Sequence, residues 1–279
     1  MHSNSSPTRP VHTLDELHAS WHDIISSFPH LVAEVENHAA RAVKLVSQIE
    51  CSPGSNSLMD LDGSFYVDLS PMTSAYAIEQ NESELPDSRL EFDYPDYPAL
   101  VRLWDLAGKD DKRLSSLMAS LFSVGEGDLG SLKDKRERES PCRAQCPCCR
   151  DSGEERARYA SMHPLFDILM LAVQKKLTLQ VRILSPFAEL AIPLLPYQVE
   201  AENGMLCAVD KDSSSAFYLD VRWLHAMRIK QVELDGTNYA LLIGYDSFGS
   251  EIFHLASPDP ADVHVWTNSC EWSRQFFSK

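Results

Sequence analysis

The sequence has 279 residues, of which 44% are hydrophobic and 24% charged, and its formal net charge is −16. This length permits one or two domains with a sizeable core, and the composition is ordinary for a globular protein. The acidic charge argues against a nucleic-acid partner, because phosphates are bound by clustered Lys and Arg. No apolar run approaches the ~20 residues of a membrane helix. The polar segment 1–10 lacks a signal core, so we predict neither membrane insertion nor secretion.

Four of the seven cysteines are crowded together: Cys142, Cys146, Cys148 and Cys149. An odd number of cysteines favours a reducing cytoplasm over a disulfide framework. Four neighbouring thiolates could hold Zn²⁺, although the order C-x3-C-x-C-C is not a usual zinc spacing. Two alternatives remain open, a redox-sensitive linker and, through Cys146-Pro147, a haem regulatory motif.

The first half of the chain is predicted to contain a helix, strands and a closing helix. Thr13 and Glu16 form a capping-box pattern at the start of an apolar series with helical spacing. The predicted elements are a disordered tail over 1–12, a helix over 14–28, strands over 31–36 and 42–50, a meander from residue 65 and a short helix after residue 110.

The second half is predicted to repeat this order after a composition break. Residues 123–158 hold a run of alternating charges and the cysteine cluster but no apolar period, which predicts a largely disordered linker. The predicted elements that follow are a helix to about residue 176, a strand over 177–184, an edge strand over 192–199, a strand over 204–209, a meander over 217–255 and a helix over 261–277.

Two segments of the chain match at a nearly constant offset. Phe65-Tyr66-Val67-Asp68 matches Phe217-Tyr218-Leu219-Asp220 at an offset of 152, and apolar matches at an offset of 151 extend to Val101 and Ile252. We therefore predict two tandem copies of one α+β unit, each with a large antiparallel sheet flanked by helices, over residues 13–122 and 159–279.

The second copy resembles a known family. Asp220-Val221-Arg222, a hairpin, Tyr245-Asp246-x-x-Gly249-x-x-Ile252 and a closing helix are similar to the half-repeat of haem-utilisation proteins of the HemS/ChuX type. The resemblance implies a cytoplasmic protein that binds haem or another small hydrophobic ligand, as a monomer or homodimer. It allows haem degradation, but nothing in the sequence requires an enzyme.

His225 and then His254 are the candidate iron ligands, because a neutral imidazole ligates haem iron well. Arg222 and Arg228 could pair with a propionate, and Tyr218 is a further candidate contact of the cofactor. Each histidine could equally be an ordinary hydrogen-bonded residue. His163 and His264 are weaker candidates.

Two other functions remain open. The strand Leu177–Arg182 and the run from Pro193 to Asp220 also resemble a ligand-sensing regulatory module of the WYL type. A duplicated fold that has lost its haem site could instead serve as a non-catalytic interaction scaffold.

Overall fold

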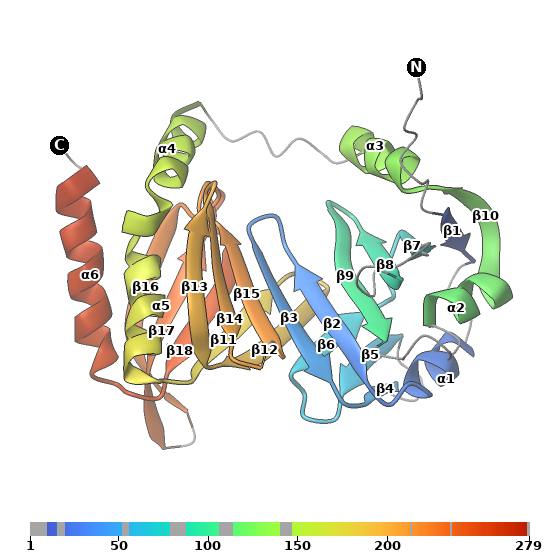
Figure 1. The fold of residues 1–279 in the computed structure, drawn as a ribbon, viewed down its shortest axis with the longest axis horizontal. Helices are drawn as coiled ribbons and strands as arrows, with labels where there is room; N and C mark the ends of the chain where they lie inside the picture. Colours follow the sequence, from blue (N-terminus) through green and yellow to red (C-terminus); the bar gives the residue numbers. More distant parts are fainter. Residues whose placement is uncertain are drawn as a thin grey trace. The chain divides into compact units, whose positions relative to one another are not determined.

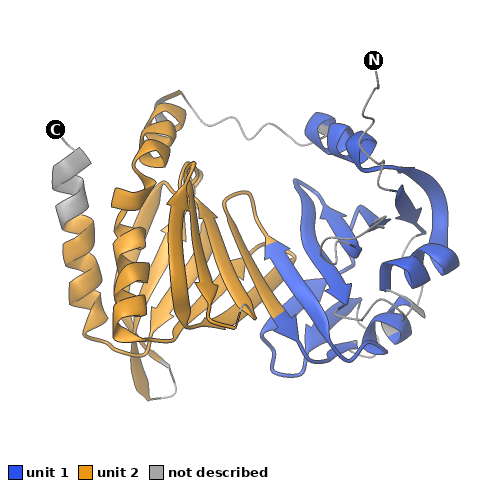
Figure 2. Ribbon diagram, in the orientation of Figure 1, with its two compact units in different colours: residues 1–35, 45–143 blue, residues 36–44, 144–279 orange. Residues whose placement is uncertain are grey.

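The computed structural model describes residues 10–15, 20–51, 56–78, 88–105, 114–139, 147–212, 214–234 and 236–277 (Figure 1). The chain divides into two compact units, coloured separately in Figure 2. Unit 1 contains residues 1–35 and 45–143, and unit 2 contains residues 36–44 and 144–279. A short segment of the N-terminal half therefore belongs to the C-terminal unit. No helix of the described residues has the length and apolar character that a membrane span needs.

Unit 1 contains two runs of antiparallel strands. The first has the order β10-β1-β7-β8-β9-β2, and the second is the meander β4-β5-β6. The strands are β1 (Pro10–Leu14), β2 (Leu31–Glu36), β4 (Ile49–Cys51), β5 (Ser57–Asp60), β6 (Phe65–Asp68), β7 (Ser74–Ile78), β8 (Arg89–Tyr94), β9 (Tyr97–Asp105) and β10 (Ser123–Asp128). The helices are α1 (Ser20–Ser26), α2 (Leu114–Phe122) and α3 (Leu129–Glu139).

Burial in β2 explains why this strand was predictable, whereas the predicted strand over 42–50 is divided between β3 (Ala40–Val46) and β4. In β2, Leu31, Ala33 and Val35 are fully buried, as period-two patterning requires. The core is anchored by Trp21 of α1, whose ring stacks on Phe92 of β8 at 6.3 Å between centroids. Helices α1 and α2 thus cover one face of the sheet.

The predicted N-terminal tail is wrong for its last residues, which form β1. This strand pairs with β7 on one side and β10 on the other, and Val11 and Leu14 are buried. Two buried side chains in five residues are too short a pattern to distinguish this strand from a polar tail. The predicted helix over 14–28 is shorter in the structure, where α1 begins at Ser20; residues 16–19 lie outside the described residues.

The predicted disordered linker is also wrong where it is described, because it contains β10, α3 and α4 (Pro147–Arg158). Helix α3 packs on unit 1 through Leu132, which is buried against Val11, Tyr76 and Ile78. The other side chains of α3 are almost all polar, so the segment shows no apolar period although it is helical.

Unit 2 has two antiparallel strand runs, β3-β15-β14-β13 and β16-β17-β18-β11-β12. Its strands are β3 (Ala40–Val46), β11 (Leu179–Leu184), β12 (Ala188–Leu194), β13 (Pro196–Glu202), β14 (Met205–Asp210), β15 (Ser215–Asp220), β16 (Ala226–Leu234), β17 (Thr237–Tyr245) and β18 (Glu251–Ser257). The remaining elements are α4, the 3-10 helix η1 (Ala160–Met162), α5 (Pro164–Lys175) and α6 (Asp262–Phe277). The α+β class with large antiparallel sheets is therefore confirmed.

The core of unit 2 lies between its two strand runs. Phe217 of β15 and Phe253 of β18 are fully buried, with ring centroids 5.4 Å apart. Gly244 of β17 makes room for this packing, since a Cβ there would lie 2.3 Å from a ring carbon of Phe253. Helix α5 packs beside β13 and helix α6 beside β16 and β17, so the helices flank the strands as in Figure 1.

The segment 36–44 is held in unit 2 by hydrogen bonds of buried groups. The Asn37 side-chain amide donates to the carbonyl oxygens of Leu184 and Ile252 at 3.0 and 2.7 Å. His38 approaches the buried carboxylate of Asp246, with 3.2 Å between Nε2 and Oδ2. Asp246 also closes the predicted turn between β17 and β18, where Oδ1 accepts the backbone N–H groups of Phe248 and Ser250.

The two units share an order of strands. In unit 1 the meander β7-β8-β9 lies beside β2, a strand that precedes it in the sequence. In unit 2 the meander β16-β17-β18 likewise lies beside the earlier strand β11. The matching residues Phe65 and Phe217 lie in β6 and β15, each at the end of a three-stranded meander. The offset of 151 does not hold for the pairing of the strands. In unit 1, Ala75 pairs with Phe92. In unit 2, the equivalent of Ala75 is Ala226, which pairs with Tyr245 rather than with Ile243, the equivalent of Phe92.

Candidate functional site

The sheet of unit 2 presents a polar row on the side opposite its core. Val181, Phe253 and Leu255 are buried, so the side chains that alternate with them point the other way. Arg228 of β16 pairs with Ile243, Ile243 with His254 of β18, and His254 with Arg182 of β11. Paired residues in antiparallel strands project from the same face. We call the surface formed by Arg182, Arg228, Tyr245, Glu251 and His254 the His254 face.

A carboxylate fixes the imidazole on this face. His254 Nε2 lies 2.7 Å from Glu251 Oε2, and the Tyr245 hydroxyl donates to Glu251 Oε1 at 3.2 Å. The hydrogen bond from His254 lowers the pKa of Glu251 below its ordinary value. The pKa of Tyr245 is raised, by desolvation first and then by Glu251, which keeps the phenol protonated. A carboxylate that holds one ring nitrogen orients the other for a ligand.

The His254 face is accessible and carries positive charge on both sides of the imidazole. The His254 side chain is 21% exposed and that of Arg182 49% exposed. Arg228 is exposed two strands from His254, and Arg182 lies on the adjacent strand, where its Nε is bonded to Glu189 at 2.5 Å. Ile243, which lies between them in the register, is itself buried, with 3% of its surface exposed. The exposed arginines of this face can pair with anionic groups of a ligand beside the imidazole.

His225 and Arg222 lie elsewhere, in the loop between β15 and β16. Arg222 is bonded to Asp220 at 2.8 Å and to the Asn203 carbonyl at 2.6 Å. His225 is exposed, and its backbone N–H donates to the Tyr245 carbonyl at 2.8 Å. Its Nδ1 is 4.0 Å from the Sγ of Cys149 in α4. The two predicted histidines are therefore not brought onto one face.

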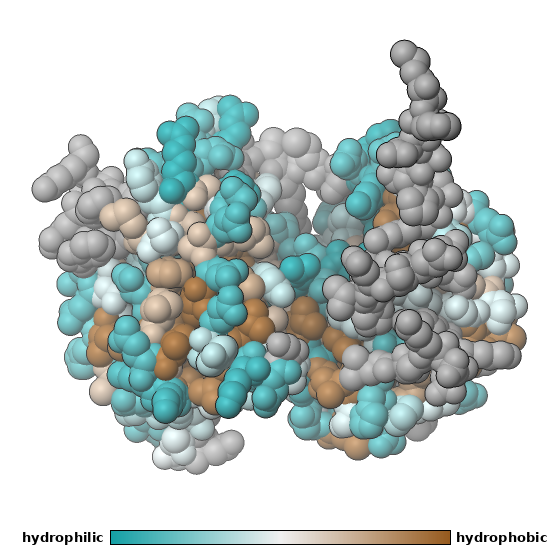
Figure 3. Space-filling view, viewed as in Figure 1, coloured by the Kyte–Doolittle hydropathy of each residue, from teal (hydrophilic) through white to brown (hydrophobic). Residues whose placement is uncertain are grey.

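Tyr218 lies on a third surface, the outer side of β13, β14 and β15. The Arg41 guanidinium lies 4.1 Å from the centre of its ring. Cys207 of β14 is the paired neighbour of Tyr218, and burial raises the pKa of its thiol. Glu200 of β13 pairs with Cys207 and completes this row, and Figure 3 shows apolar and polar surface side by side on the unit that holds these strands.

Sequence reasoning undervalued His163, which caps helix α5. Its Nδ1 accepts the backbone N–H of Leu165 at 3.2 Å, and Pro164 occupies the first helical position. Burial, and then the charge of Arg156, lowers the pKa of His163 to about 4. The imidazole is therefore neutral at physiological pH. A polar residue directly before Pro and an apolar helical series is the signal that could have identified this cap.

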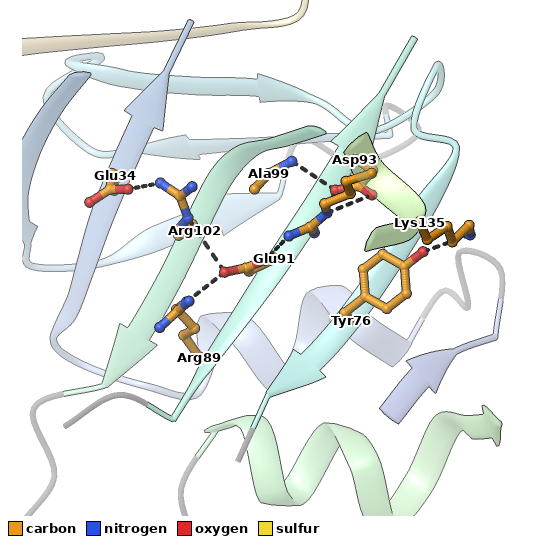
Figure 4. Close-up of polar contacts among 9 residues, drawn as sticks. Glu34, Tyr76, Arg89, Glu91, Asp93, Ala99, Arg102 and Lys135 are labelled. Carbon is orange, nitrogen blue, oxygen red and sulfur yellow. Dashed lines mark hydrogen bonds and ion pairs between the residues drawn. The ribbon is translucent and has the colours of Figure 1, made fainter. Parts of the chain in front are cut away.

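Unit 1 contains a buried charged cluster, drawn in Figure 4. Glu91 of β8 contacts Arg89 at 2.6 Å, Arg136 of α3 at 2.5 Å and Arg102 of β9 at 3.4 Å. Burial alone would raise the pKa of Glu91, but these three guanidinium groups lower it below its ordinary value. The other members of the cluster are Glu34, which is bonded to Arg102, Asp93, which is bonded to Arg136 at 2.6 Å, and Tyr76, which is bonded to Lys135 at 3.0 Å.

This cluster is matched internally. Each carboxylate has an arginine partner, and Asp93 also accepts the backbone N–H of Ala99 at 2.7 Å. Ala99 has a positive φ of 50°, so the Asp93 bond fixes the chain where β9 begins. The cluster therefore holds α3 against β8 and fixes the backbone at the start of β9, and we assign it a stabilising role.

The described residues give the predicted zinc site no support. They contain no group of three or more His, Cys, Asp or Glu that could hold a metal ion. Cys142 and Cys146 lie outside the described residues, and of Cys148 only the backbone, in α4, is described. Cys149 is half-exposed and has His225 beside it.

Comparison with known proteins identifies the class of fold. No family model and no curated protein matches the sequence. Solved structures do match. The Escherichia coli haem oxygenase ChuS is 11% identical, with a TM-score of 0.61 over 88% of this chain and 83% of that chain. The haem-binding protein PhuS from Pseudomonas aeruginosa is 10% identical, with a TM-score of 0.63 for the apo form over 93% of this chain and 86% of that chain.

The holo form of PhuS matches with a TM-score of 0.62 over 89% of this chain and 81% of that chain. The chain therefore has the fold of the haem-utilisation proteins of the HemS/ChuX type. This confirms, for the fold, the resemblance carried by the Tyr245-Asp246-x-x-Gly249 segment.

Proposed function

We propose that this protein binds and handles haem. The observation that carries the proposal is the likeness to two haem proteins over most of both chains, with TM-scores near 0.6. Haem carriage requires only a binding site, whereas degradation requires further chemistry. A ligand-sensing role has no comparable structural support.

The His254 face is the site that we assign to haem. His254 would hold the haem iron through its imidazole, and Glu251 would fix the orientation of the ring. Arg228 and Arg182, which lie on either side of His254 in the register, would pair with the propionates. Bound haem would supply an iron centre for ligand or oxygen chemistry. Tyr245, protonated beside Glu251, would act as a hydrogen-bond donor rather than as an iron ligand.

The proposal includes an internal duplication. The shared strand order, and the positions of Phe65 in β6 and Phe217 in β15, support two copies of one unit. At the offset of 151, the charged residues and the imidazole of the His254 face correspond to apolar residues of unit 1, such as Leu103 for His254 and Ala77 for Arg228, and only Tyr245 has a polar counterpart, Tyr94. We therefore place a single haem site in unit 2.

Ligand assignment by substitution and rescue tests this site. Haemin is titrated into the wild type, His254→Gly and the control His264→Gly, which changes an exposed histidine of α6. We expect His254→Gly to lose the Soret band of the complex and to regain it when free imidazole is added. The control should bind as the wild type does.

Other histidines provide the alternative outcomes. Loss of the band in His225→Ala or in His163→Asn, with His254→Gly unchanged, would move the site to the region of α4 and α5. The His163→Asn change keeps a side chain able to cap α5 and removes the imidazole. Unchanged spectra in all three variants would contradict ligation by any of these three histidines.

A further inference from the structure

Helix α4 is pinned against the loop that follows β15. The Arg156 side chain donates to the carbonyl oxygens of Val221 and Arg222, each at 3.1 Å. Gly153 permits the close approach, since a Cβ there would lie 2.7 Å from the Arg222 carbonyl oxygen. These contacts of the second half of α4 hold the helix against the loop that contains His225, and they are independent of the His254 face.

The pinned helix places a thiol beside an imidazole. Cys149, in the first turn of α4, has its Sγ 4.0 Å from His225 Nδ1, and both side chains reach solvent. The Arg156 guanidinium is near enough for its charge to act on a Cys149 thiolate. A proton acceptor, a nearby cation and a helix N-terminus are the surroundings that make cysteines reactive.

We propose that Cys149 and His225 form a nucleophilic thiol site, which hydroperoxides and other soft electrophiles modify at Cys149. This site goes beyond the haem function and does not depend on it. The reactant is a small electrophile, which reaches both side chains from solvent.

The reaction with a hydroperoxide balances without another reagent. The thiol sulfur attacks the terminal peroxide oxygen, an S–O bond forms and the O–O bond breaks. His225 accepts the thiol proton and passes it to the departing alkoxide, which leaves as an alcohol, or as water when the oxidant is hydrogen peroxide. Sulfur is oxidised by two electrons to a sulfenic acid, and the peroxide is reduced by two electrons.

Peptide-resolved alkylation of the haem-free, full-length protein tests the proposal. Iodoacetamide is applied at about pH 7, where activation of a thiol changes the thiolate fraction most. Fragment spectra separate Cys149 from Cys148, and Cys270 in α6 serves as the half-exposed reference. We expect Cys149 to react about tenfold faster than Cys270, as a thiol with a proton acceptor does. Hydrogen peroxide should leave a dimedone-reactive sulfenic acid at Cys149.

The matched variants are His225→Asn, which removes the base, and His264→Asn, which removes an exposed histidine of α6. His225→Asn should slow alkylation of Cys149 about tenfold and leave Cys270 unchanged. Faster labelling of the half-buried Cys207 would reveal an unfolded variant, in which case the wild-type ratio of Cys149 to Cys270 decides. A ratio near one, or a Cys149 rate that His225→Asn does not lower in folded protein, would overturn the proposal.

Discussion

Replacement of His163 by Asn should remove a defined part of the acid sensitivity of unit 2. The folded-state pKa of His163 is about 4, against 6.5 for an unperturbed histidine. Because the folded pKa is depressed, the unfolded chain binds more protons between these values. The stabilising effect of the neutral imidazole is therefore complete above pH 6.5 and is lost as the pH falls toward 4.

The magnitude follows from the pKa difference. A difference of about 2.5 at about 1.4 kcal/mol per pH unit gives about 3 kcal/mol. Urea unfolding, followed through the fluorescence of the five tryptophans, measures the free energy of unfolding of wild type and variant at each pH. Asn at this position can still accept the Leu165 N–H, so the comparison isolates the titrating group.

We expect the difference in free energy of unfolding between wild type and His163→Asn to shrink by about 3 kcal/mol between neutral pH and about pH 4. The other histidines and the carboxylates titrate in both proteins and cancel in the difference. A difference that stays constant across this range would refute the assignment of His163 as a buried neutral cap.

Three further predictions concern packing and charge. Arg136→Ala should lower the free energy of unfolding of unit 1 by about 3 kcal/mol, because it removes a cation from Asp93 and from the buried Glu91. Arg138→Ala, on the exposed side of α3, is the control. Equal effects of the two changes in urea unfolding would contradict the role of the cluster. Gly244→Ala should destabilise unit 2 by about 2 kcal/mol through the clash with Phe253, and an unchanged melting temperature would show that the ring can move away. Glu251→Gln should weaken haemin binding about tenfold by loosening His254, as spectroscopic titration would reveal, whereas Glu233→Gln on the edge strand β16 should have no effect.

The parts of the fold with strong periodicity were predictable from sequence. The meander of β16, β17 and β18 follows from alternating apolar residues and from the turn at Gly249, which has a φ of 83°. Strand β1 and helix α3 were not predictable, because each is held by one or two buried apolar side chains and by partners far away in the sequence. Tyr76 contacts Lys135 across 59 residues, and no local pattern encodes such a pair.

The candidate site was predicted in its residue types but not in its grouping. Spacing could not show that Arg228 and His254 share a row across β17, since the register depends on a bulge between Gly244 and Tyr245. Nor could it show that His225 faces Cys149, from which it is separated by 76 residues. The cap at His163 could be predicted from Pro164 and the apolar helical series that follow it, whereas its burial could not, because burial depends on how α5 packs.

Equilibrium titration of haemin into the wild-type protein tests the central claim most directly. The account predicts a saturable Soret band with a sharp break at a single haemin per chain, together with a spectrum of histidine-ligated iron. A rise in absorbance that continues linearly with added haemin, with no break, would mean that the chain keeps the fold of a haem protein without the function.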